Sequence, residues 1–414
     1  MDADSDRFLK NIGWLGISEG FMRLTRLGTA VVLARVLDPV TFGIAALVLT
    51  INELVHVFNK NGIGAKIVQC DTAELDEIVE TAYRMGFVIC TSLFVIQCLL
   101  AYPIAEYYGS PSLTPMLQVL ALVYLLMPFG LVQSALVQRA QRMKTKALID
   151  GVQVCIDNIL TALFAIGGLG AWAIVLPKIL VTPIWLIGYR KAIHWSPSGK
   201  FFQFAQWKEI LKFGRFFLGI EVLKTARLNL DNLIIAKFLG IEALGLYYFA
   251  RNAGLGFSMS LINAMSAALY PNLCELKTDT QKLKTRFLHN LKRVSSIVSP
   301  LILLQTLLAP WYVPIVFGPQ WNDAIPILML LCFSAVLRPL GESASALALA
   351  TEHIQLDFWW NLMFTLIFIV IAVLGAQSSL LAVAFGIAAL YTITQPLYCR
   401  FVYQRVFKRP IENS

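Results

Sequence analysis

Long hydrophobic runs separated by short polar segments dominate the chain. Most runs have about 20 residues, the length that a helix needs to cross roughly 30 Å of hydrocarbon at about 1.5 Å per residue. The alternating ten-residue strands of a membrane barrel are absent. The pattern predicts an all-α polytopic membrane protein. We expect twelve spans, at residues 11–35, 40–59, 82–102, 114–137, 147–167, 171–189, 210–237, 241–269, 291–309, 323–350, 354–375 and 379–402.

The two halves of the chain share motifs in the same order. Ala34-Arg35-Val36-Leu37 matches Ala236-Lys237-Phe238-Leu239 at an offset of 202, which also superposes Glu19 on Glu221. Pro128-Phe129-Gly130 and Ser134-Ala135-Leu136 match Pro339-Leu340-Gly341 and Ser345-Ala346-Leu347 at an offset of 211. Six spans per copy give both halves the same orientation, so the repeat predicts a pseudo-two-fold axis along the membrane normal. We expect an N-terminal six-helix bundle at 1–195, a cytoplasmic linker at 196–209 and a C-terminal six-helix bundle at 210–414.

Charge distribution predicts the orientation of the chain. The formal net charge is +9, but the basic residues lie between hydrophobic runs, so they indicate membrane topology and not nucleic-acid binding. The connections at 103–113, 168–170, 310–322 and 376–378 contain no Lys or Arg, whereas those between spans 2 and 3, 4 and 5, 6 and 7, and 8 and 9 are basic, as is the C-terminal tail. Both termini are therefore expected in the cytoplasm. The polar start, MDADSDRFLK, does not resemble a cleavable signal peptide.

Charged residues interrupt the hydrophobic stretch at 216–251. At 100° per residue, four of them fall within a 120° arc of one helix: Glu221, Lys224, Arg227 and Asp231. An ionisable side chain at the bilayer centre costs at least roughly 2.5 to 3.5 kcal/mol, so such a row is expected to face water, partners or a ligand. The row predicts one wall of a polar central cavity. A structural ladder of i, i+3 and i, i+4 ion pairs is the alternative.

Three further arginines are candidates for the same cavity. Arg23 and Arg26 share a face of the first span with Glu19, and Arg251 in span 8 has no acidic neighbour within one turn. These positions favour anion binding. Arg35 and Lys237 lie at span ends, where long basic side chains reach the membrane surface.

Span 2 places Glu53 and His56 on one face with Asn52 and Asn59. Such a face can hydrogen-bond hydroxyl groups or relay a proton, although a lone intramembrane histidine is often a packing residue. Elsewhere the sequence predicts structural ion pairs. The expected pairs are Asp157 with Lys178 and Arg338 with Glu342.

Sequence motifs for cofactors and catalysis are missing. There is no GxxxxGK[ST], GxGxxG, HExxH or GxSxG with partner residues, so no cofactor is expected and the chain is not predicted to be an enzyme. The seven cysteines show no metal-ligand spacing, so no metal site is expected. Two like-oriented repeats with an internal cationic lining favour transport of an anionic amphiphile, because guanidinium groups bind phosphate in a forked geometry.

Several segments resemble one family of transporters. LDNLIIAKFLGIEALGLYYFARN at 230–252, LARVLDPVTFG at 33–43, LYPNLCEL at 269–276 and VFGPQW at 316–321 are similar to the bacterial polysaccharide flippases of the multidrug/oligosaccharidyl-lipid/polysaccharide superfamily, in the lipopolysaccharide or exopolysaccharide exporter subgroup. The resemblance implies alternating access by two bundles in the bacterial inner membrane. It also implies that an undecaprenyl-pyrophosphate-linked oligosaccharide is the substrate.

On this resemblance, substrate-binding residues are expected at Arg23, Arg26, Lys224, Arg227 and Arg251. Polar or coupling residues of the cavity are expected at Glu53, His56, Glu221 and Asp231. Membrane lipids, a polysaccharide polymerase and other assembly proteins are the expected partners. Two alternatives stay open: a cation-coupled small-molecule antiporter of the same superfamily, and a membrane glycan-processing enzyme or non-transporting component of glycan assembly.

Overall fold

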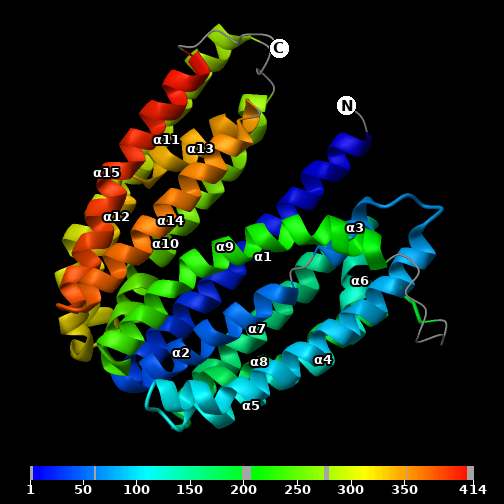
Figure 1. The fold of residues 1–414 in the computed structure, drawn as a ribbon, viewed down its shortest axis with the longest axis horizontal. Coiled ribbons are helices and arrows are strands. Elements are labelled where there is room, and N and C mark those ends of the chain that lie inside the picture. The colour runs from blue at the N-terminus through cyan, green and yellow to red at the C-terminus, as the bar shows by residue number, and fades with distance from the viewer. Residues whose placement is uncertain (1–2, 60–61, 198–206, 275–278, 352, 408–414) are drawn as a thin grey trace. The chain divides into compact units, whose positions relative to one another are not determined.

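A computed structural model describes residues 3–59, 62–197, 207–274, 279–351 and 353–407. Within these ranges the regular structure is helical and no strand is present, which confirms the predicted all-α class. The chain divides into two compact units, Met1–Asn229 and Leu230–Ser414. Figure 1 shows the first unit in blue to green and the second in green to red.

The first unit contains eight α-helices and the first part of a ninth. They are α1 (Ala3–Val36), α2 (Pro39–His56), α3 (Ile63–Gln69), α4 (Leu75–Tyr107), α5 (Leu113–Leu126), α6 (Pro128–Arg139), α7 (Met143–Ile166), α8 (Trp172–Ala192) and α9 (Trp207–Phe238). A 3-10 turn at Val57–Asn59 extends α2. Helix α1 packs along α7, and α7 packs along α8.

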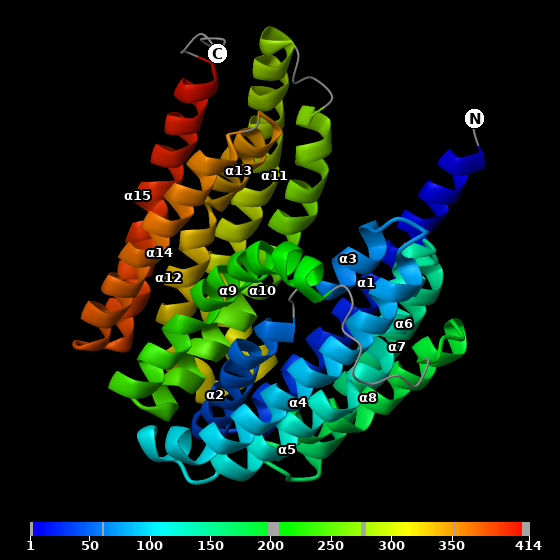
Figure 2. The same cartoon turned by 45° about the vertical axis from the view of Figure 1, so that its right-hand side comes forward.

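The second unit begins within α9 and contains six further α-helices. They are α10 (Ile241–Cys274), α11 (Thr280–Tyr312), α12 (Ile325–Ala335), α13 (Arg338–Ala350), α14 (Ile354–Ala376) and α15 (Leu380–Phe407). A π-helical turn at Val313–Phe317 and a 3-10 turn at Pro319–Ala324 join α11 to α12. Figure 2 shows α12, α14 and α15 side by side.

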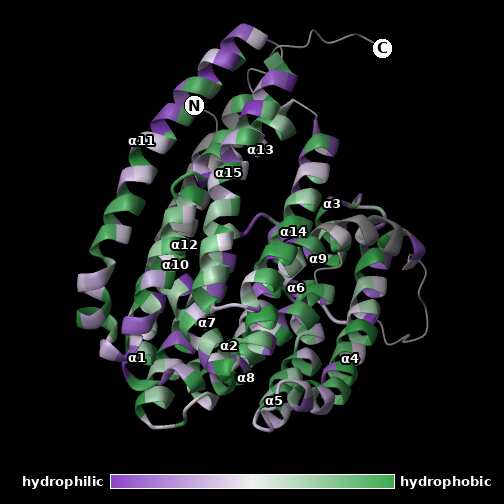
Figure 3. Ribbon diagram, turned by 60° about the vertical axis from the view of Figure 1, so that its left-hand side comes forward, coloured by the Kyte–Doolittle hydropathy of each residue, from purple (hydrophilic) through white to green (hydrophobic). Residues whose placement is uncertain are grey.

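The helices account for the predicted spans. Among the described residues, eight helices are long and hydrophobic enough to cross a membrane, and nine when the bent pair of α5 and α6 is counted as one span. Three more helices, α1, α9 and α10, have 32 to 34 residues each, which exceeds the length required for crossing. Helices α1 and α9 contain the charged faces singled out above. Together these elements give twelve spans, and Figure 3 shows hydrophobic residues along most of their lengths.

Several helices extend beyond the predicted spans. Helix α11 begins at Thr280, whereas its span is expected to begin at 291, and the additional turns contain Lys282, Lys284 and Arg286. The carboxylate of Asp279 caps its start and accepts a hydrogen bond from the Lys282 backbone N–H at 3.0 Å. This bond holds the pKa of Asp279 below its usual value. A polar helical extension therefore precedes the hydrophobic part of the span.

Spans 4 and 10 are broken at equivalent prolines. Helices α5 and α6 meet at a bend of 54°, immediately before Pro128. Helix α12 ends at Ala335 and α13 begins at Arg338, immediately before Pro339. Pro339 lies 211 positions after Pro128. Proline lacks a backbone N–H and its ring clashes with the preceding turn, so a continuous helix is unfavourable there. The repeated Pro-x-Gly motif thus marks a repeated break.

The packing confirms the repeat predicted from the sequence. In the first unit α5 packs against α4 and α8, while α8 also contacts α6 and α7. In the second unit α12 packs against α11 and α15, while α15 also contacts α13 and α14. The same sequential positions therefore pack together in each unit.

A glycine in each broken span permits close packing by the last helix of its unit. A Cβ on Gly130 in α6 would lie 2.5 Å from the ring of Trp185 in α8. A Cβ on Gly341 in α13 would clash with the amide of Gln395 in α15. Both close approaches use the same position of the repeat, so the motif has a packing function.

The same three side chains also meet near one end of each unit. In the first, Tyr189 of α8 donates to Asp150 of α7 at 2.9 Å and lies close to Ser134 of α6. In the second, the equivalent residues of α15, α14 and α13 make the same contacts: Tyr398, Asp357 and Ser345. Each set connects three helices of one bundle.

The expected domain boundary is not settled by these contacts. Most of the predicted linker, 196–209, lies outside the described residues. Division by contacts falls later, between Asn229 and Leu230 inside α9, because Ile210 of α9 belongs to a hydrophobic cluster with residues of α3, α4 and α6. The boundary at 209 and 210 stays a prediction.

Candidate functional site

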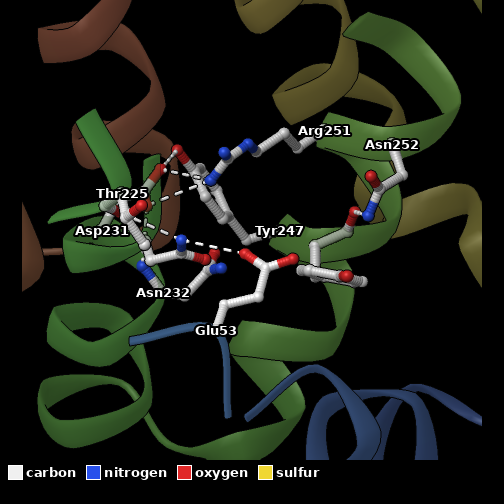
Figure 4. A network of polar contacts seen from close by, with 9 residues as sticks. Glu53, Thr225, Asp231, Asn232, Tyr247, Arg251 and Asn252 are labelled. Carbon is white, nitrogen blue, oxygen red and sulfur yellow. Dashed lines mark hydrogen bonds and ion pairs between the residues drawn. The ribbon is translucent and has the colours of Figure 1, made fainter. Parts of the chain in front are cut away.

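A charged cluster lies between α9 and α10 in the second unit. Arg251 Nη1 lies 3.1 Å and 3.0 Å from the two carboxylate oxygens of Asp231. The hydroxyl of Tyr247 donates to Asp231 Oδ2 at 2.8 Å, and the backbone N–H of Asn232 donates to Oδ1 at 3.0 Å. Figure 4 shows these groups converging on the carboxylate. Three donor groups therefore surround the Asp231 carboxylate.

The connection between the two helices explains this convergence. Helix α9 ends at Phe238 and α10 begins at Ile241, with Gly240 in the left-handed region at φ 89°. Such a short turn places the end of α9 beside the start of α10. Tyr247 and Arg251 are spaced i, i+4, so they share the face of α10 that meets Asp231.

The cluster lies deep in a span. Arg251 is ten positions after the start of the 34-residue helix α10, about 15 Å along its axis. The Asp231 side chain is 5% exposed, whereas that of Arg251 is 23% exposed. One side of the guanidinium is therefore held by a buried carboxylate, and part of its surface remains accessible. This geometry presents a fixed cation at depth.

The first unit positions a second acidic group on α2. Asn229, which is 6% exposed, donates from Nδ2 to Glu53 Oε2 at 3.0 Å and to the backbone oxygen of Thr225 at the same distance. Glu53 itself is exposed. An asparagine anchored in α9 therefore orients an accessible carboxylate.

The other polar residues of α2 face neighbouring helices. Tyr124 of α5 lies within hydrogen-bond distance of Asn52 Oδ1, at 3.2 Å, and the His56 ring stacks on the Tyr124 ring with centroids 6.0 Å apart. Asn59 Oδ1 accepts from the Cys90 thiol at 3.2 Å. Three members of the predicted face thus contribute to packing, whereas Glu53, at the edge of its arc, is exposed.

Arg23 and Arg26 of α1 are exposed in the first unit. Helix α1 contacts α7 through other residues: Thr29 donates to the Asn158 backbone oxygen at 2.9 Å, and Asn158 Nδ2 donates to Thr25 at 3.1 Å. Arg23 and Arg26 lie away from this face of the helix.

The predicted row on α9 divides into two kinds of residue. Lys224 is exposed and lies 3.4 Å from Glu221, so the expected i, i+3 pair is present. Arg227 is half-buried. Asp231 is buried and held by α10, so Arg251, which has no acidic neighbour within one turn of its own helix, has an acidic partner on α9. The side chain of Glu19, which the repeat aligns with Glu221, lies outside the described residues.

Predicted ion pairs outside the site have a structural role. Lys178 of α8 contacts Asp157 of α7 at 2.5 Å, as the sequence predicts. Arg338 lies over the ring of Tyr391, 4.1 Å from its centroid, a contact that the sequence did not suggest. The first contact connects α7 with α8 in the first unit, and the second connects α13 with α15 in the second unit.

Sequence reasoning missed the polar contacts of Tyr247, Asn229 and Tyr124. Tyr247 had a detectable signal, because it precedes Arg251 by four residues and a buried tyrosine hydroxyl requires a partner. Asn229 and Tyr124 had none, since their partners come from distant segments of the chain.

Known proteins support the same architecture. The chain is 27% identical over 392 residues to the lipopolysaccharide biosynthesis protein WzxC of Escherichia coli, covering 92% of this chain and 77% of that protein. It is 22% identical over 357 residues to the succinoglycan biosynthesis transport protein ExoT of Rhizobium meliloti, covering 85% and 71%. The lipid II flippase MurJ, in an inward closed conformation, has a similar fold, with a TM-score of 0.76 at 14% identity over 95% of this chain and 89% of that one.

A family model described as polysaccharide biosynthesis protein matches residues 32–326. This range includes α2 to α11 and therefore both clusters described above. The match covers more than half of the 414 residues. The chain is a multi-pass membrane protein that belongs to the polysaccharide biosynthesis protein family.

Proposed function

We propose that this protein is a flippase that moves an undecaprenyl-pyrophosphate-linked oligosaccharide repeat unit across the bacterial inner membrane for lipopolysaccharide or exopolysaccharide synthesis. The carrying observation is the Arg251 side chain, which is 23% exposed and which buried Asp231 holds ten residues after the start of α10. A planar guanidinium suits a pyrophosphate, and low surrounding polarity strengthens their attraction. The names of two relatives, a lipopolysaccharide biosynthesis protein and a succinoglycan transport protein, agree with this substrate class.

The substrate head would bind basic side chains while its polyprenyl chain stays in lipid. We assign Arg251 the central contact with phosphate, with Arg227, Lys224, Arg23 and Arg26 as additional basic groups of the cavity. The bundles would expose this cavity alternately to the cytoplasm and to the periplasm. Polymerase and other assembly proteins would receive the product.

Acidic groups would couple binding to an ion gradient. A substrate phosphate that attracts Arg251 would weaken its contact with Asp231 and leave that carboxylate free to interact with the coupling ion. Glu53, Glu221 and His56 are additional candidates for this coupling. The ion itself is an outcome to be measured in liposomes with imposed proton or sodium gradients.

A translocation assay with reconstituted protein tests the central assignment. The double variant Asp231→Asn/Arg251→Gln removes both charges, so neither is left buried without its partner. We expect at least about a tenfold loss of translocation of a fluorescent lipid-linked oligosaccharide, since one buried charge-assisted contact is worth roughly 1.5 to 3 kcal/mol. Arg251→Lys should retain part of the activity because it keeps the positive charge.

A matched control removes another intramembrane ion pair. The double variant Asp157→Asn/Lys178→Gln changes the contact between α7 and α8, which has no role in the proposed binding. It should translocate normally at equal protein abundance. Normal translocation by Asp231→Asn/Arg251→Gln would reject Arg251 as the anion-binding group.

A small-molecule antiporter is the competing function. It would extrude cationic dyes and leave lipid-linked oligosaccharide on its original side. Dye efflux from cells that produce the protein, compared with polymer recovery in a strain lacking it, separates the two activities. We expect restored polymer without dye efflux.

A further inference from the structure

A cavity of about 490 Å³ lies at one end of the second unit, apart from the charged cluster. It is bordered by residues at the start of α14 and near the end of α15, namely His353, Gln355, Leu356, Phe401 and Arg405. Its volume is within the roughly 300 to 1,000 Å³ typical of small-ligand sites. None of these residues enters the proposed transport mechanism.

The cavity combines a hydrophobic wall with polar groups. Phe401 is 48% exposed, and its ring also stacks near Trp360. Arg405 is exposed and, among the described residues, has no carboxylate partner. His353 Nδ1 lies 2.8 Å from the Thr351 backbone oxygen, so that nitrogen is the donor and Nε2 is left for a ligand. One end of the cavity therefore favours a negative group and the other favours hydrocarbon.

The position of the cavity places it at a membrane surface. The span in α14 begins at Gln355, and α15 ends two residues after Arg405, at Phe407. Gln355 lies in the first turn of α14, where the helix dipole favours negative charge. A ligand here would have its charged part at the interface and its hydrophobic part against the span.

Two residues that border this cavity differ from the residues at the corresponding positions of the first repeat. The offset of 207 that relates Asp150 to Asp357 relates Lys146 to His353. In the first unit Lys146 extends to Asp150 at 2.7 Å, whereas His353 turns toward Thr351. At the offset of 209 that relates Tyr189 to Tyr398, Arg405 corresponds to uncharged Ser196. Among the described residues, the second copy combines an arginine without a carboxylate partner with a histidine turned away from the aspartate.

The geometry points to a binding site for the phosphate headgroup of an anionic phospholipid. Arg405 contacts the phosphodiester, His353 Nε2 donates to it when protonated, and Phe401 and Leu356 pack on the glycerol and the first acyl carbons. Among the described residues, Asp357 is the acidic group near the cavity, and its carboxylate accepts a hydrogen bond from Tyr398 of α15. A bound lipid of this kind would stabilise the last two helices of the second unit. This inference is independent of the transport proposal.

Binding to purified protein tests the site. Native mass spectrometry would compare retention of phosphatidylglycerol with that of phosphatidylcholine by the full chain in detergent. We expect preferential retention of phosphatidylglycerol, reduced about fivefold by Arg405→Gln, the effect of one basic residue near an anionic lipid surface. Arg400→Gln is the matched control, because Arg400 is also exposed on α15 but does not border the cavity. Equal retention by both variants and the wild type would overturn the site.

A second variant excludes loss of folding as the explanation. Gln355→Glu introduces a negative charge into the cavity, yet an acidic residue in the first turn favours the helix. We expect weaker phosphatidylglycerol retention with no fall in thermal stability. Inorganic phosphate and glycerol phosphate form the other arm: Arg405-dependent binding of either, as tight as that of the lipid, would identify a soluble-phosphate site and reject the lipid assignment.

Discussion

The buried carboxylate of Asp231 accepts hydrogen bonds from α10 and from the backbone of its own helix, α9. Arg251 and Tyr247 approach from α10, and the backbone of Asn232 completes the set. Burying a charge without a partner is expensive, whereas removing both members of a pair is often tolerated. The stability of this region therefore depends on keeping or losing the two charges together.

This reasoning predicts an order of stability among variants. Arg251→Ala leaves Asp231 buried without its cation and should lower the free energy of unfolding by about 3 to 5 kcal/mol. Asp231→Asn/Arg251→Gln should cost less than the single change. Thermal unfolding in detergent measures both. A double variant less stable than Arg251→Ala would contradict the pairing in the structure.

At the residue scale the sequence identified the charged residues of the site but not the residues that contact them. Arg251 and Asp231 were both singled out, yet their contact was missed because ion pairs were sought within one helix turn. The connection at Gly240 brings two helices together, and spacing within either helix contains no such information. His56 shows the converse, because its place on a polar face did not reveal the ring of Tyr124.

Helices α7 and α14 differ in how their repeated aspartates are supported. Asp150 accepts from Tyr189 and is also paired with Lys146. For Asp357, Tyr398 is the donor found among the described residues, because His353 faces Thr351. Both bundles therefore have the same hydrogen bond from tyrosine to aspartate. In the first bundle the aspartate also has a lysine partner, Lys146.

Removal of the tyrosine hydroxyls should reveal this difference. Tyr398→Phe leaves Asp357 without its donor and should cost about 1 to 3 kcal/mol, whereas Tyr189→Phe leaves Lys146 in place and should cost about 0.5 to 1.5 kcal/mol. Thermal unfolding midpoints of the two variants provide the comparison. Equal shifts would show that the lysine contributes nothing at Asp150.

At the scale of elements, hydrophobic runs predicted the spans well because a bilayer imposes their length. The runs did not predict the break at Met127 or the start of α11 at Thr280. A proline in a hydrophobic run is compatible with either a kink or two helices. A basic segment has no hydrophobic signal, although it can continue a helix.

For the whole molecule, the remaining prediction concerns orientation. Basic connections on one side place both termini in the cytoplasm. Green fluorescent protein fused after Ser414 should fluoresce, and alkaline phosphatase inserted near Gly109 should be active, since that connection has no Lys or Arg. The reverse pattern at both sites would invert the topology and require the proposed direction of transport to be reassigned.

The triad of serine, tyrosine and aspartate in each bundle also bears on origin. Fusion of two copies of one gene would place the same contact in both halves. On this account the contact already connected the last helices of a six-span ancestor. An even number of crossings let the second copy enter the membrane without inverting its charges. After fusion the two copies could diverge independently. The positions of Lys146 and Ser196 in the first copy correspond to those of His353 and Arg405 in the second, and the two copies now differ there.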